Sequence, residues 1–208
     1  MSSAAWIEVK ETFAEAAGWF VATTAEVHSS WQDSALGEWT VRDLAGHTSR
    51  ALLTVESYLD RLADVEDVAS PVEYFWHFRS TDDPAVGSAV VAERGRAAGR
   101  ALGPEAAAEV AAIAERVLGR VEAADGEELV TTPFGGMRLV NYLPTRTFEL
   151  IVHTCDLAAA LGRIEVPEKA ARESLDLVGG LAARGGRAAP LLRAATGRSG
   201  LPDGFTVL

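Results

Sequence analysis

The sequence predicts an all-α protein built around a bundle of helices. Alanine dominates its apolar residues and is the best helix former. Apolar side chains recur at spacings of three and four over long stretches, the pattern of a helix with one buried face. β-branched residues flank a group of turn residues between 128 and 140. With 208 residues, the chain is long enough for one domain with a sizeable core.

Two helices are expected in the first part of the chain. The first runs from about Ala4 to His28, and a loop containing Gly37 follows. The second begins sharply at Thr40, a good N-cap with Asp43 three places later, and is expected to end near Ala63. Their predicted buried faces are Trp6, Val9, Phe13, Ala16, Ala17 and Phe20 in the first, and Val41, Leu44, Ala45, Thr48, Leu52, Val55 and Leu59 in the second.

The middle of the chain is more mixed. Residues 64–83 are acidic and then aromatic, and Pro71 can open a short helix there. A third helical stretch covers about 84–124, with a break at the Gly-Pro pair 103–104, because proline fits only the first turn of a new helix. Residues 128–140 predict a small hairpin or an irregular loop.

The fourth long helix is expected from about Leu143 to Leu161, with Gly162 as its C-terminal stop. A shorter helix follows Pro167 and reaches about Arg184. No strong linker interrupts the chain. We therefore expect residues 1–165 to form the helical bundle, and residues 166–208 to form a helical extension packed on the same domain.

Composition excludes several classes of protein. A net charge of −11 argues against nucleic acid as a partner, because phosphate binding needs a basic surface. No apolar run approaches the roughly 20 residues of a membrane span, and the N-terminus does not resemble a secretory signal. A soluble cytoplasmic protein is therefore expected.

The single cysteine, Cys155, excludes an internal disulfide and is interpreted as a small buried residue rather than a nucleophile.

Four histidines can supply metal ligands: His28, His47, His77 and His153. A lone histidine is more often an ordinary surface or core residue. Glu149 and His153, however, stand four residues apart on an otherwise apolar helix, and project from one face of it. A buried charge there needs a partner. That partner is either a metal or an ordinary ion pair, and on this helix alone the ion pair is favoured.

His47 changes that balance. It lies midway through the second helix on the core face, after Gly46, a poor helix former that makes sense if something approaches closely. One histidine from one helix and a Glu-x-x-x-His pair from another commonly build a metal site in a bundle. Three such ligands leave a coordination position open, as in catalytic zinc sites. The hypothesis is one divalent metal, with zinc favoured over nickel, iron or manganese, and with His28 and His77 outside the site.

Two segments carry a resemblance to a known family. WTVRDLAGH at 39–47 and RTFELIVHTCDLA at 146–158 resemble the N-terminal metal-binding domain of the mycothiol-dependent maleylpyruvate isomerases, in the DinB-like superfamily. The resemblance covers residues 1 to about 165 and implies a four-helix bundle with one long crossover. It also implies a zinc site and the neighbours that orient it, with His47, Glu149 and His153 as ligands and Asp43, Arg146 and Asp156 around them.

One difference from this family limits which of its properties can be expected of this chain. The isomerase has a further C-terminal domain, which contributes an arginine toward the thiol cofactor, and we expect no room for that domain after the helix at 167–184. The resemblance therefore supports the metal site better than it supports mycothiol use or maleylpyruvate as the substrate.

The leading functional hypothesis is a metal-dependent thiol S-transferase or isomerase. Zinc would bind a low-molecular-weight thiol such as mycothiol and direct it at a small electrophile. Because the protein is acidic overall, arginines such as Arg50, Arg79 or Arg146 would have to supply local positive charge. The aromatic cluster at 74–78 either roofs the pocket or, as we favour, is a plain core patch under the crossover.

Two alternatives remain open. A metal-dependent hydrolase would use water in the open position, but no spare carboxylate stands out as its general base. A non-enzymatic metal-binding module would keep the site without turnover. The sequence leaves both a monomer and a homodimer open.

Overall fold

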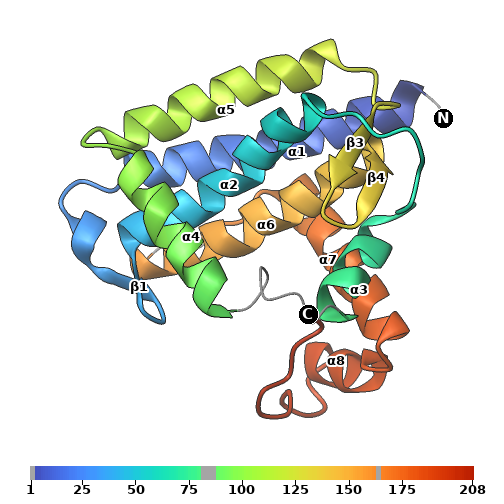
Figure 1. The fold of residues 1–208 in the computed structure, drawn as a ribbon. Coiled ribbons are helices and arrows are strands. Elements are labelled where there is room, and N and C mark those ends of the chain that lie inside the picture. Colours follow the sequence, from blue (N-terminus) through green and yellow to red (C-terminus); the bar gives the residue numbers. More distant parts are fainter. Residues whose placement is uncertain (1–2, 81–87, 163–164) are drawn as a thin grey trace.

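The computed structural model describes residues 3–80, 88–162 and 165–208. Over these residues the protein is mainly helical, with two small antiparallel sheets of two strands each (Figure 1). The predicted all-α class is therefore confirmed. No helix in these ranges is both long and apolar enough to cross a membrane.

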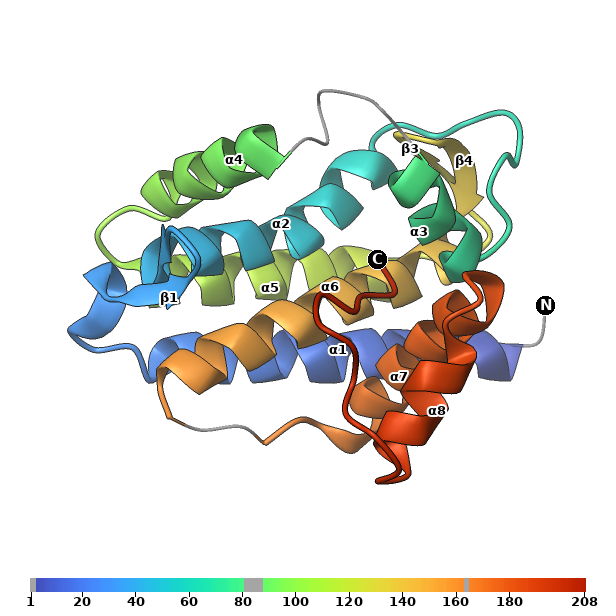
Figure 2. The same cartoon turned by 90° about the horizontal axis from the view of Figure 1, so that it is seen from below.

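Four long helices form the bundle: α1 (Ser3–Ala25), α2 (Val41–Leu59), α5 (Ala106–Ala123) and α6 (Leu139–Ala160). They lie side by side in both views (Figures 1 and 2). Helix α1 contacts α5 and α6, and α2 contacts the same two helices, so the four enclose one core. The fully buried side chains of that core include Phe13, Phe20, Leu44, Leu52, Leu143 and Leu150.

A long connection joins α2 to α5 and carries two shorter helices, α3 (Pro71–Ser80) and α4 (Ser88–Ala101). Helix α4 packs along α2, whereas α3 contacts α6 and α7 near the other end of the bundle (Figure 2). This is the predicted crossover. The predicted break before α5 is also present, with Gly103 at a φ of +67° between α4 and α5.

The segment at 128–140 is a hairpin of β3 (Leu129–Thr132) and β4 (Gly135–Arg138), and it leads directly into α6. We expected α6 to begin near Leu143, but it begins at Leu139. Carbonyl groups of the preceding loop accept hydrogen bonds from the first N–H groups of the helix, at 2.8 Å for Leu139 and 3.1 Å for Val140. These bonds satisfy donors that a helix start leaves unpaired. Because the helix begins earlier than expected, Pro144 lies inside it.

Both N-terminal helices end before their predicted limits. Helix α2 ends at Leu59 rather than Ala63, because the following backbone pairs with β3: the N–H of Ala63 donates to Leu129 O at 2.7 Å. Helix α1 ends at Ala25 rather than His28. Between them lie a 3-10 turn, η1 (Ser30–Gln32), and a small hairpin of β1 (Ser34–Leu36) and β2 (Trp39–Thr40), which the sequence analysis did not predict.

The C-terminal part contains α7 (Glu168–Arg184) and α8 (Ala188–Ala195). Helix α7 packs against α1 and α6, and it follows Pro167 as expected. Helix α8 was not predicted, although Pro190 stands in its first turn, where proline is tolerated.

Candidate metal centre

A local hydrogen-bond motif fixes the helix that presents His47. The Thr40 side chain accepts the N–H of Asp43 at 3.2 Å, and the Asp43 carboxylate accepts the N–H of Thr40 at 3.1 Å. This capping box starts α2 at Val41 and confirms the predicted helix start. The Asp43 carboxylate accepts hydrogen bonds from the N–H and the hydroxyl of Thr40, so Asp43 fixes the start of the helix that carries His47.

The structure brings His47 of α2 together with Glu149 and His153 of α6. One ligand atom from each of the three residues lies within 4.8 Å of the other two. Nε2 of His153 is 3.2 Å from Oε2 of Glu149, and their side chains are only 17% and 26% exposed. Two helices far apart in sequence thus assemble the cluster that the sequence predicted.

Three features of these residues fit a metal ion. Nδ1 of His47 is buried without a hydrogen-bond partner in the described chain. Nδ1 of His153 lies 3.5 Å from Oδ2 of Asp156, so the second nitrogen of this imidazole faces a carboxylate. Such a carboxylate commonly orients metal-binding histidines. Two imidazole nitrogens and one carboxylate oxygen are also a donor set found in zinc sites.

The electrostatics of the cluster favour one positive charge on its two imidazoles, at His153 rather than at His47. Burial and, after it, the charge of the neighbouring His153 lower the pKa of His47 to about 4. Burial acts in the same direction on His153, but the carboxylates of Asp156 and Glu149 outweigh it and raise its pKa to about 9. Because metal ligation requires neutral imidazoles, a metal ion would compete with the proton on His153.

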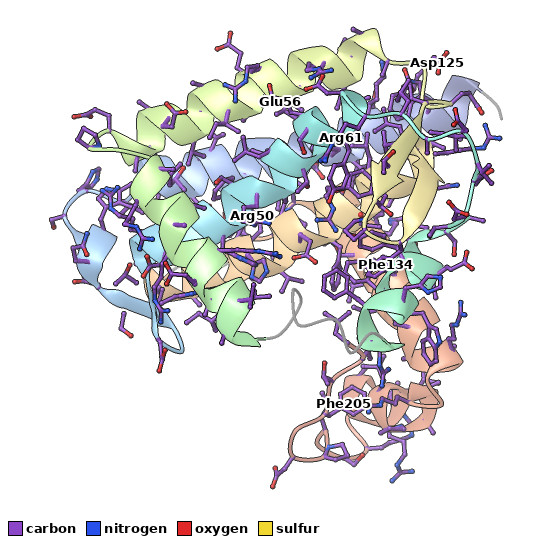
Figure 3. The ribbon with its side chains drawn as sticks, in the orientation of Figure 1. Arg50, Glu56, Arg61, Asp125, Phe134 and Phe205 are labelled. Atoms are coloured by element: carbon purple, nitrogen blue, oxygen red, sulfur yellow. The ribbon has the colours of Figure 1, made fainter. Side chains whose placement is uncertain are left out.

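A cavity of about 270 Å³ opens beside the cluster. Its wall includes all three members of the cluster, together with Arg50 of α2, Arg94 of α4 and Arg146 of α6. Tyr58, Tyr74, Phe78 and Pro133 also line it. Figure 3 shows Arg50 in the middle of the bundle and Phe134 at the tip of the β3–β4 hairpin, next to α3. The cavity is therefore cationic and aromatic around the candidate metal centre.

Arg146 is the most deeply placed of the three cations, with 8% of its surface exposed. Its guanidinium lies 5.3 Å from the ring of Tyr74 and 5.1 Å from that of Tyr142, and its Nε donates to Oγ1 of Thr145. No carboxylate of the described residues is within ion-pair distance of it. Arg146 thus presents a buried positive charge to the cavity beside Glu149.

One expectation about the cavity wall was wrong, and one residue of the wall was not predicted. Arg79 does not line the cavity: it donates to the carbonyl of Val207 at 3.2 Å and lies over the ring of Trp76. Arg94 lines it instead, and the sequence analysis missed it. Its position three residues after Val91, which also lines the cavity, was the available signal, but only the packing of α4 on α2 identifies that helix face.

The aromatic cluster at 74–78 serves as core and as cavity wall. Tyr74 and Phe75 are each only 3% exposed, which agrees with the favoured interpretation of a core patch. Tyr74 and Phe78 nevertheless face the cavity, so the alternative of a roof over the pocket also has support.

The fold and the cluster together define a class: a helical bundle with a His/Glu/His site between two of its helices. The family model of the mycothiol maleylpyruvate isomerase N-terminal domain matches residues 13–158, and the chain belongs to this family. Comparisons with curated proteins and with solved structures gave no match. The matched range contains α2 and α6, and so includes all six residues predicted for the site and its surroundings.

Proposed function

We propose that this protein is a metal-dependent thiol S-transferase or isomerase. His47, Glu149 and His153 would hold one divalent metal ion, with zinc favoured by the donor set. The observation that carries the proposal is the convergence of these three ligand atoms within 4.8 Å at the wall of a 270 Å³ cavity. Membership of a family named for a mycothiol-dependent isomerase supports a low-molecular-weight thiol, such as mycothiol, as the cosubstrate.

Three protein ligands leave room in the coordination sphere for a small molecule. A zinc ion in this position supplies Lewis-acid chemistry that keeps a thiol in its reactive thiolate form near neutral pH. The protein's own residues would orient the ligands: Oε2 of Glu149 lies 3.2 Å from Nε2 of His153, and Asp156 lies by the other nitrogen of that imidazole. The cavity wall then determines which electrophile can approach.

The arginines favour an electrophile that carries a carboxylate. Burial lowers the pKa of Arg50, and the charges of Arg94 and Arg146 also lower it, so both of these guanidinium groups repel that of Arg50. Arg50 forms no ion pair with any carboxylate of the described residues. An anionic group in the cavity would relieve this repulsion and pair with donors that fit carboxylates well. The neighbouring Tyr74 and Phe78 offer apolar surface to its carbon skeleton.

A hydrolase would need a general base in addition to the metal ligands. Glu149 is the only carboxylate among the described residues that line the cavity, and it is already a candidate ligand. This disfavours the hydrolase.

A thiol-dependence assay on metal-loaded protein separates the possible functions. Maleylpyruvate serves as the test of isomerisation and an activated aryl chloride as the test of S-transfer, each with mycothiol, bacillithiol, glutathione or no thiol. We expect turnover only when a thiol is present, and its loss in Glu149→Ala but not in His28→Ala. Equal rates with and without thiol would exclude the transferase and isomerase. Absence of turnover with every thiol and electrophile would favour a binding module.

A further inference from the structure

Trp39 connects the candidate metal centre to a neighbouring helix. It stands directly before the N-cap of α2, and its ring lies against that of His47, with centroids 4.6 Å apart and planes inclined by 36°. On its other side, the indole Nε1–H donates a hydrogen bond to the carbonyl of Ala92 in α4, at 3.1 Å. One side chain thus touches a candidate ligand and the backbone of α4.

His47 lacks the polar support that His153 has. Nε2 of His153 lies 3.2 Å from Oε2 of Glu149, and its Nδ1, although it makes no hydrogen bond to the described residues, lies 3.5 Å from Oδ2 of Asp156. Within the described chain, by contrast, the ring nitrogens of His47 have neither a hydrogen bond nor a carboxylate within ion-pair distance, and its Nδ1 is buried. The orientation of His47 therefore depends on ring contacts, namely Trp39 against its face and His153 at 4.7 Å with an interplanar angle of 86°.

Helix α4 approaches α2 closely at the same place. A Cβ atom at Gly95 would lie 2.8 Å from Cζ2 of Trp39, so the indole occupies the space that this glycine leaves. A Cβ at Gly46 would overlap the backbone of Gly99, which explains the glycine next to His47. Since Val91 and Arg94 of α4 line the cavity, the Trp39 indole contacts both the ligand ring and the helix that forms one cavity wall.

We infer that Trp39 is a positioning residue for the metal centre: its indole holds the His47 imidazole in the orientation for ligation and fixes α4 beside it. Packing replaces the hydrogen bond that usually orients a metal-binding histidine. The inference rests on the proposed metal site, because it assigns a role toward a ligand of that site. It adds a residue that makes no bond to the metal itself.

The zinc Kd, measured by competition with a chromophoric chelator, and the visible spectrum of the cobalt(II) form test this inference. We expect Trp39→Leu to weaken zinc binding by about tenfold to a hundredfold, the usual effect of removing a residue that orients a ligand. The cobalt bands should also shift, because they depend on ligand geometry. A role in folding alone would lower Tm but leave both readouts unchanged. Trp39→Phe, which keeps a ring against His47, should recover part of the affinity.

Gly95→Ala provides a second variant in case Trp39→Leu does not fold. Its added methyl group would displace the Trp39 ring without touching any ligand, so zinc binding should again weaken. Trp31→Leu is the matched control, because Trp31 packs over Arg42 rather than over His47, and its zinc Kd should equal that of the wild type. Unchanged Kd and cobalt spectra in folded Trp39→Leu or Gly95→Ala would overturn the inference while the metal site stands. A wild-type protein that binds no metal would overturn both.

Discussion

Glu149 and Glu173 are both partly buried glutamates, on the neighbouring helices α6 and α7, but their surroundings are opposite. Burial disfavours the charge of Glu149, yet the hydrogen bond from His153 and the charge of Arg146 lower its pKa. Burial also disfavours the charge of Glu173, and with Glu8 and Asp176 as its charged neighbours the pKa rises to about 7.

The comparison shows what distinguishes a candidate site from a buried acid. The imidazoles and the guanidinium around Glu149 favour its anionic form. Burial and the neighbouring acids of Glu173 instead disfavour its charged form. Only the first arrangement can offer a ready ligand to a cation, because ligation needs the deprotonated carboxylate. A groove of about 790 Å³ beside Glu173 is larger than the cavity at Glu149, so size alone does not identify the site.

The largest expected effect is loss of the metal. Purified wild-type protein should contain about one metal ion per chain, and His47→Ala, Glu149→Ala or His153→Ala should each contain almost none, because three protein ligands leave little redundancy. Elemental analysis measures this directly. Glu173→Ala is the matched control and should keep its metal.

Histidines outside the cluster give a further control for the same measurement. His77 stacks on Phe134 at 5.6 Å and His28 follows α1, and neither belongs to the cluster. Replacing either with alanine should leave the metal content intact. Loss of metal in His77→Ala would mean that the site is wrongly placed, and undiminished metal in a ligand variant would remove that residue from the site.

Prediction of this site from sequence worked where the signals are local. The spacing of Glu149 and His153 places both on one helix face, and Thr40 with Asp43 marks the start of α2. Both relations depend on residues within one turn of a helix. The structure confirms the capping box and the proximity of the three side chains, whereas metal binding itself stays a prediction.

Prediction from the sequence was weaker where contacts between distant segments determine the structure. Helix α2 ends early because Ala63 pairs with Leu129, which is far away in sequence. Arg79 and Arg94 have the same chemistry, and only the packing of α3 and α4 determines which of them reaches the cavity. Those contacts leave no local pattern, so the spacing of Arg94 after Val91 was not enough to select it.

The second-largest expected effect is on substrate binding, and it concerns Arg146, which lines the cavity together with Glu149. Replacing it with methionine keeps much of the volume but removes the positive charge from the cavity. Loss of a hydrogen bond to a charged group costs about 1.5 to 3 kcal/mol, so the KM for a carboxylate-bearing electrophile should rise by roughly tenfold to a hundredfold. Arg79→Met is the matched control, because Arg79 contacts Val207 outside the cavity. An equal KM in Arg146→Met and wild type would exclude an anion-binding role.

A third effect is the stability supplied by the bound metal. Zinc that binds only the folded state should add about 2.7 kcal/mol when its free concentration is a hundred times Kd. For a chain of this length that corresponds to a Tm increase of roughly 5 to 10 °C. Differential scanning calorimetry with zinc and with chelator measures the shift. Glu149→Gln should lose it and Glu173→Gln should keep it, and a shift that persists in Glu149→Gln would place the stabilising metal elsewhere.

The smallest effect is the pH dependence that Glu173 confers. In the folded protein its pKa is about 7, against 4.5 for an ordinary glutamate. The folded state therefore binds more protons than the unfolded chain between these values. The stabilisation is fully present below about pH 4.5 and is lost as the pH rises through about 7. With allowance for the partial exposure of the carboxyl group, we expect this loss to be about 1 to 2 kcal/mol.

Glu173→Gln tests this directly, because a glutamine stays neutral at every pH. Unfolding by urea at pH 5 and at pH 8 should show a smaller fall in the free energy of unfolding for the variant than for the wild type. Glu115→Gln, which removes an exposed acid from α5, is the charge-matched control and should follow the wild type. Identical pH profiles for Glu173→Gln and Glu115→Gln would show that folding does not raise the pKa of Glu173, and the contrast with Glu149 would then disappear.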